Sequence, residues 1–184
     1  MVELNDSKKT LILGFHGRII DHLGIQMYQS PTAAIAEILA NAWDADAEAV
    51  SIDFNFDSAS KEEWTITITD DGQGMTLDDC QNRFLTVGYN RRESKGPKEV
   101  TEGKSRSVMG RKGIGKFAGF GIARFIRIGT TSKKTGEFTD FELDLLAIRK
   151  GDSYVSTDAL KIDVIEHIPG ESQRPSGTVI TLPD

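Results

Sequence analysis

The chain has 184 residues, of which 38% are hydrophobic and 27% charged, and its formal net charge is −6 at pH 7. This length and composition predict one globular domain, and no internal repeat or low-complexity segment is visible. No apolar run reaches the length of a membrane span and the first residues do not resemble a signal peptide, so we expect a cytoplasmic protein. The single cysteine, Cys80, excludes an internal disulfide, and the histidines lack the spacing of a zinc site.

After an N-terminal strand and a short helix, a longer helix is predicted from about Thr32 to Trp43. Ser30 and Pro31 suit its N-cap and its first position. Apolar residues recur at helical spacing at Ile35, Ile38, Leu39 and Ala42.

This helix carries a row of polar side chains beside its apolar stripe. Glu37, Asn41 and Asp44 are separated by steps of four and three residues, which keep them within roughly 60° of one another around the helix. Taken alone, such a row fits either a catalytic face or the solvated side of an amphipathic helix.

Two strands are predicted next, near Val50 to Phe56 and from Trp64 to Thr69. The second strand ends in the turn Asp70-Asp-Gly-Gln-Gly-Met75. A carboxylate in that place can accept a hydrogen bond from a ligand amine, and the glycines permit close approach of ligand and backbone. Because Thr76 and Asp79 have the spacing of a capping box, the turn leads into a helix instead of a hairpin.

The segment from Gly88 to Lys116 is basic in an acidic chain. It holds nine Lys or Arg and three Glu, a net charge of +6, which leaves −12 for the remaining residues. Its Gly, Ser and Pro content is typical of a mobile loop, so we expect a lid over an anionic ligand. A solvated surface loop and a nucleic-acid patch are the alternatives, although Tyr89 is the only aromatic residue among its charges.

The lid ends in a glycine-rich stretch from Gly110 to Gly121, which predicts a loop followed by a helix from about Gly115 to Ala123. The pattern G-x-x-x-x-G-K is present, but Phe117 occupies the position where a P-loop needs Ser or Thr. The dinucleotide fingerprint also fits, but no strand precedes it. A glycine loop at a helix N-terminus, with Lys116 beside it, still predicts a phosphate site.

The remaining chain reads mainly as strands. They are predicted at Arg124 to Thr131, Phe138 to Leu145, Lys161 to Ile168 and Thr178 to Leu182. The turn around Gly136 favours an antiparallel hairpin. We therefore expect an α+β fold, a two-layer sandwich with a mixed, largely antiparallel sheet and helices on one face.

Four motifs in this order resemble the GHKL superfamily of ATPases, which comprises gyrase, the ninety-kilodalton heat-shock chaperones, histidine kinases and MutL. The Glu37-x-x-x-Asn41-x-x-Asp44 motif resembles its N box. The first glycine box has its counterpart at Asp70-x-Gly-x-Gly and the second at Gly110-x-x-Gly-x-Gly. Ser-Gly-Thr178 resembles the start of its last strand. The branch that looks most similar is that of MutL, MORC and type IIB topoisomerases, and the resemblance implies the Bergerat fold.

The resemblance also implies roles for individual residues. Glu37 would be the general base that polarises water for attack on the γ-phosphate, and Asn41 would hold Mg²⁺. Asp70 would accept a hydrogen bond from the adenine amino group. The full set of nucleotide-binding residues would be Asn41, Asp44, Asp70, Gly72, Gly74, Met75, Gly110, Gly113, Ile114, Gly115, Lys116, Phe117 and Thr178.

The function implied is Mg²⁺-dependent ATP binding and hydrolysis that drives lid closure and dimerisation of a larger protein, for which DNA is a candidate partner. Residues 1–184 would form one ATP-binding domain, an N-terminal fragment without the transducer domain of its relatives, and a slow ATPase when isolated. A nucleotide sensor that does not hydrolyse ATP and the catalytic half of a histidine kinase are the alternatives. Glu37 favours hydrolysis, and the residues printed before Thr32 do not read as the phospho-accepting helical hairpin expected of a histidine kinase.

Overall fold

The computed structural model describes residues 9–15, 30–56, 64–87, 100–101, 103–110, 115–150 and 160–183. Within these ranges the chain forms an eight-stranded sheet in the order β2-β3-β8-β5-β6-β7-β1-β4. The strands are β1 (Thr10–Phe15), β2 (Val50–Asn55), β3 (Thr65–Asp70), β4 (Thr86–Val87), β5 (Phe125–Thr131), β6 (Phe138–Asp144), β7 (Leu160–Ile168) and β8 (Gly177–Pro183).

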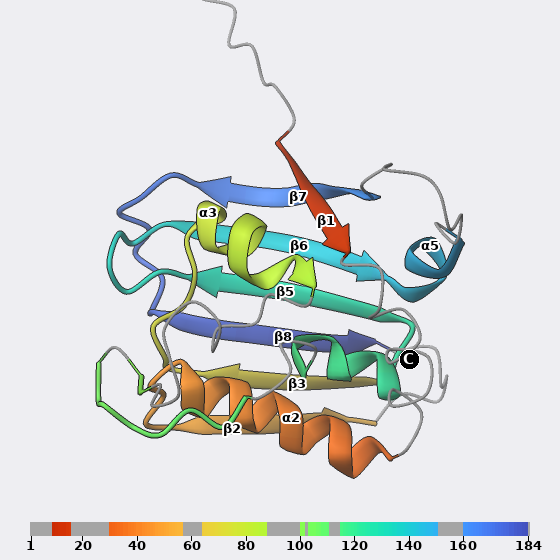
Figure 1. The fold of residues 1–184 in the computed structure, drawn as a ribbon, viewed down its shortest axis with the longest axis horizontal. Helices are drawn as coiled ribbons and strands as arrows, with labels where there is room; N and C mark the ends of the chain where they lie inside the picture. Colours follow the sequence, from red (N-terminus) through yellow and green to blue (C-terminus); the bar gives the residue numbers. More distant parts are fainter. Residues whose placement is uncertain are drawn as a thin grey trace, which may run out of the picture.

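Helical segments cover one face of this sheet (Figure 1). They are α2 (Pro31–Asp44), α3 (Leu77–Asp79), the π-helical turn η2 (Cys80–Phe84) and the 3₁₀ helix η3 (Gly115–Gly121), with α5 (Leu145–Lys150) at the end of β6. Among the described strands the β1–β4 pair is parallel and the other pairs are antiparallel. The predicted α+β sandwich with a largely antiparallel sheet is confirmed.

Helix α2 forms close to where the sequence predicts it. The Ser30 side chain accepts a hydrogen bond from the Ala33 amide, and Pro31 occupies the first helical position. The helix buries Ala34, Ile38 and Ala42, whereas the predicted core residue Leu39 stays 37% exposed. Its C-terminal end lies beside the segments that carry the other motifs.

The predicted helix after the glycine loop is shorter than expected and has a different geometry. It is a 3₁₀ helix that ends at Gly121, and the expectation of an α-helix to Ala123 is therefore wrong. Phe117 and Phe120 are both buried, and their rings stack with centroids 6.4 Å apart. Side chains three residues apart share one face of a 3₁₀ helix, and a glycine-rich segment gains little from the α-helical form.

The strands of the second half agree with the sequence prediction to within a few residues. β5 and β6 form the expected hairpin, in which Gly136 adopts a φ of 68°. The short helix α5 was not predicted. The short helix expected after the first strand falls outside the described residues.

The core lies between the sheet and the helical layer. It includes Leu13, Ile128, Phe141 and Leu182, and the predicted burial of Cys80 is confirmed because this side chain is fully enclosed. In the described part of the chain, no helix has both the length and the apolar character needed to cross a bilayer.

Candidate nucleotide site

Helix α2 is the element on which the sequence motifs meet. Its Glu37 carboxylate lies so close to Gly115 that a Cβ atom at position 115 would overlap it. Glu37 is exposed and Asn41 half-buried on the same helix. The start of η3 therefore lies against the proposed catalytic carboxylate, and an added Cβ at position 115 would require the exposed Glu37 side chain to move aside.

Asp44, one turn further along α2, binds the backbone that leads into the second glycine box. Its two carboxylate oxygens accept hydrogen bonds from the Met109 amide at 2.7 Å and the Gly110 amide at 2.8 Å. Because the Gly110 amide already has this partner, Gly110 contributes to the site here by fixing the position of the loop. Gly113 and Ile114 of the same box fall outside the described residues.

The first glycine box contacts the same end of α2. The Gln73 amide donates to the Ala45 carbonyl at 2.8 Å, and a Cβ at Gly72 would come within 2.7 Å of that oxygen. The N box and the two glycine boxes, far apart in sequence, are thus joined through the last turns of one helix.

Asp70 ends β3 in a largely enclosed environment. One of its oxygens accepts a hydrogen bond from the Gly72 amide at 2.9 Å, and the Thr178 amide of the neighbouring strand β8 also donates to the carboxylate. Burial raises the pKa of Asp70 above its ordinary value, and these two hydrogen bonds only partly oppose that rise. A half-buried carboxylate at a strand end suits the recognition of a ligand amine.

A threonine on β5 connects the glycine turn to the last strand. The Thr130 hydroxyl, which is fully buried, accepts a hydrogen bond from the Met75 amide at 3.0 Å and lies 3.2 Å from the Thr178 hydroxyl. Gly74 has a φ of 58° and its backbone packs against Thr131 so closely that a Cβ would overlap the carbonyl. Thr130 is not among the residues predicted from the sequence, where its only signal is a hydroxyl residue within a strand that is otherwise largely apolar.

Lys116 and Phe117 contact other parts of the chain in the structure. The Lys116 ammonium donates to the backbone carbonyls of Arg83 at 2.7 Å and Thr86 at 2.8 Å. The Phe117 side chain belongs to the core and packs against Phe84. A phosphate contact by Lys116 stays a prediction, and it requires the ammonium group to exchange these carbonyls for phosphate oxygens.

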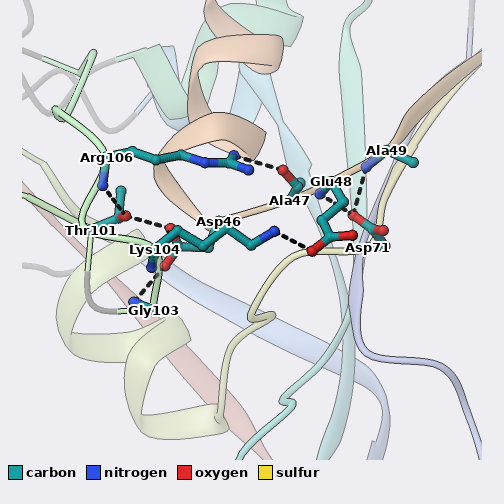
Figure 2. Close-up of polar contacts among 9 residues, drawn as sticks. All are labelled: Asp46, Ala47, Glu48, Ala49, Asp71, Thr101, Gly103, Lys104 and Arg106. Atoms are coloured by element: carbon teal, nitrogen blue, oxygen red, sulfur yellow. Dashed lines mark hydrogen bonds and ion pairs between the residues drawn. The ribbon is translucent and has the colours of Figure 1, made fainter.

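Asp71, the residue after the adenine-site candidate, has a structural partner. Its Oδ1 accepts hydrogen bonds from the amides of Glu48 at 2.7 Å and Ala49 at 2.9 Å (Figure 2). These bonds, first that of Ala49 and then that of Glu48, lower the pKa of Asp71. Asp71 thus ties the loop after α2 to the end of β3.

A magnesium ion bound beside Asn41 would have to take most of its ligands from a nucleotide. Within the described ranges, no group of three or more His, Cys, Asp and Glu side chains could hold a metal ion. The amide oxygen of Asn41 is a hard ligand, and Mg²⁺ is commonly held by one or two protein oxygens together with substrate phosphates. Asn41 would hold the ion only together with phosphate oxygens and water.

Comparison with known proteins identifies the family of the chain. The model of the family described as histidine kinase-, DNA gyrase B-, and HSP90-like ATPases matches residues 28–178. The chain belongs to this family. The matched range contains all the motifs on which the resemblance was recognised.

Several curated proteins are similar to part of the chain. A putative type II restriction enzyme, HgiDII of Herpetosiphon aurantiacus, is 37% identical over 116 residues, which are 63% of this chain and 17% of that protein. The chaperone protein HtpG of Gluconobacter oxydans is 31% identical over 137 residues, 65% of this chain and 21% of the chaperone. HtpG of Clostridium acetobutylicum is 30% identical over 139 residues, which are 68% of this chain and 22% of that chaperone. The chain thus spans about a fifth of the length of these relatives. The similarity to MutL, MORC and topoisomerases stays a prediction.

Proposed function

We propose that this chain binds ATP with Mg²⁺ and hydrolyses it. The observation that carries this proposal is the meeting of three motifs at α2: Glu37 beside Gly115, Asp44 beside Gly110, and Ala45 beside the Asp70 turn. A family assignment over residues 28–178 supports the same activity.

The side chains of Asp70, Asn41 and Glu37 have separate tasks in this proposal. Asp70 accepts a hydrogen bond from the adenine amino group and so selects adenine over guanine, which has a carbonyl in that place. Asn41 holds the magnesium ion, which supplies positive charge to the triphosphate. Glu37 takes the proton of the attacking water, because its carboxylate lies at the start of η3 where the terminal phosphate is expected.

The ATP cycle of the full-length protein would act through partners. We propose that ATP binding favours a homodimer of the full-length protein and that the cycle acts on DNA or on a protein effector. One relative is named as a putative restriction enzyme and others as HtpG chaperones, so both kinds of effector are consistent with the relatives. A cytoplasmic location remains a prediction.

Calorimetric titration with ATP and GTP in the presence of magnesium tests nucleotide binding. We expect binding of ATP and much weaker binding of GTP, and equal affinities would refute the role of Asp70. Turnover of the full-length protein, measured with and without DNA, then separates an ATPase from a nucleotide sensor. A protein that binds ATP with magnesium and shows no turnover under either condition would be a sensor.

A further inference from the structure

The segment of residues 100–101 and 103–110, here called the docked segment, is fastened to the C-terminal end of α2. It has few apolar anchors, as its sequence predicts, since Val100 and Met109 are more than half exposed. Its attachment is polar and was not foreseen from the sequence. The residues on the helix side run from Trp43 to Glu48 and include Asp44, the last residue of the polar row.

Asp46 is the centre of this attachment. Its carboxylate accepts hydrogen bonds from the Thr101 hydroxyl, the Gly103 amide at 2.7 Å and the Lys104 amide at 3.2 Å (Figure 2). Asp46 is 5% exposed and adopts a φ of 61°, a conformation that aspartate tolerates better than most residues. Because three donors converge on the carboxylate, it is occupied as an acceptor and is poorly suited to ligate a cation.

The docked segment folds back on itself next to the Asp46 carboxylate. The Thr101 amide donates to the Arg106 carbonyl, and the Arg106 amide donates to the Thr101 hydroxyl, which closes a tight turn around Asp46. A Cβ at Gly103 would approach Asp46 Oδ2 to 2.8 Å and the Gln73 side chain of the first glycine box to 3.0 Å. The turn therefore lies against the glycine box as well as against the helix.

Contacts on both sides of Asp46 extend the attachment toward Gly110. The Arg106 guanidinium donates to the Ala47 carbonyl at 2.7 Å and lies 4.5 Å from the centre of the Trp43 ring. The Trp43 indole donates to the Ser107 carbonyl at 3.1 Å. Beyond Ser107 come the two amides that Asp44 binds, so Thr101 and residues 103–110 lie along the end of α2.

We propose that Asp46 is a positioning residue: it holds the docked segment on α2 and thereby fixes Met109 and Gly110, the start of the phosphate-binding loop, beside the proposed catalytic helix. Asp46 touches no nucleotide in this proposal. The proposal rests on the proposed function, and it predicts that loss of Asp46 weakens binding of the phosphates and leaves recognition of the adenosine part unchanged.

Nitrogen-15 NMR of the 184-residue chain tests the positioning role of Asp46 in two ways. Titrations with Mg²⁺-ATP and with adenosine give the two affinities. Amide hydrogen exchange without ligand reports on the backbone of the docked segment. For Asp46→Asn we expect the affinity for ATP to fall about 10-fold and that for adenosine to stay within about twofold. The Met109 and Gly110 amides should exchange faster, although neither contacts Asp46. Thr101→Val keeps the shape of the side chain and removes the hydroxyl that donates to Asp46 and accepts from the Arg106 amide. It should cause smaller changes in the same directions and serves if the first variant does not fold.

Glu48→Gln is the matched control, since Glu48 pairs with Lys104 of the same segment at an exposed position. We expect it to leave both affinities unchanged. An unchanged ATP affinity in both Asp46→Asn and Thr101→Val, or an equal loss of ATP and adenosine binding, would overturn the positioning role. If the unaltered chain binds neither ATP nor adenosine, the proposed function itself is refuted. The positioning role of Asp46 is then refuted as well.

Discussion

Replacing Asp70 by asparagine should lower nucleotide affinity and raise stability. The amide keeps an oxygen that can accept hydrogen bonds from the Gly72 and Thr178 amides, so the local backbone pairing is retained. The substitution removes the negative charge and replaces one acceptor oxygen of the carboxylate by an NH₂ group, which is a donor. A donor facing the adenine amino group leaves both groups without a partner.

The expected loss of affinity follows from that mismatch. Leaving a buried polar group unpaired costs about 1–3 kcal/mol, which corresponds to a decrease in affinity of about 5- to 150-fold. The lower part of this range applies if water reaches the edge of the base. GTP binding should change much less, because guanine has a carbonyl in place of the amino group from which Asp70 would accept a hydrogen bond.

The effect on stability has the opposite sign. Burial raises the pKa of Asp70 above 3.8, so the native state binds a proton more readily than the unfolded state. The stability linked to this carboxyl is therefore present at low pH and is lost as the pH rises through the native pKa. At neutral pH the ionised group is unfavourable to folding, and Asp70→Asn should raise the midpoint of thermal unfolding.

Asp71→Asn is the control, because it makes the same change one residue along at an exposed position. Hydrogen bonds from Ala49 and Glu48 lower the pKa of Asp71 below 3.8, so its stabilising contribution is present above that value and is lost as the pH falls through the native pKa. Asp71→Asn should therefore lower the unfolding midpoint at pH 7 and leave ATP affinity unchanged.

Calorimetric titration with ATP and thermal unfolding without nucleotide, both at pH 7, distinguish the two carboxylates. ATP binding by Asp70→Asn as tight as that of the unaltered protein would refute the role of Asp70 in adenine recognition. Loss of binding together with a lower unfolding midpoint would also refute it, since that result would indicate a damaged fold. Repeating the unfolding at pH values down to 3 should reduce the difference between Asp71→Asn and the unaltered protein.

Other changes test the remaining groups. Glu37→Ala should bind ATP normally and lose about 10²- to 10⁴-fold in turnover of the full-length protein; normal turnover would disprove the general-base role. Asn41→Ala should weaken ATP binding when magnesium is present and have little effect when it is chelated, as calorimetry with and without chelator would show. Burial raises the pKa of Cys80 to about 12, so iodoacetamide at pH 8 should alkylate it only after unfolding, as mass spectrometry would detect.

The elements that the sequence predicted well have signals confined to a few neighbouring residues. The helix that begins after Ser30 carries its own cap, and the capping box of Thr76 and Asp79 forms as its spacing indicated. The paired strands near Val50 and Trp64 alternate in a way that needs no distant partner to be recognised. For the same reason the row of Glu37, Asn41 and Asp44 could be located on one helix before its surroundings were known.

The tertiary structure decided which partners those residues have. Asp46 and Thr101 are 55 positions apart, and nothing near either residue in the sequence indicates that they are bonded. The Lys116 ammonium lies on carbonyls 30 and 33 positions away, whereas its sequence context indicated a phosphate. The segment from Gly115 becomes a 3₁₀ helix because Phe117 and Phe120 enter the core together. Local sequence determines caps, turns and periodicity, but hydrogen bonds and packing between distant segments depend on where the whole chain brings them together.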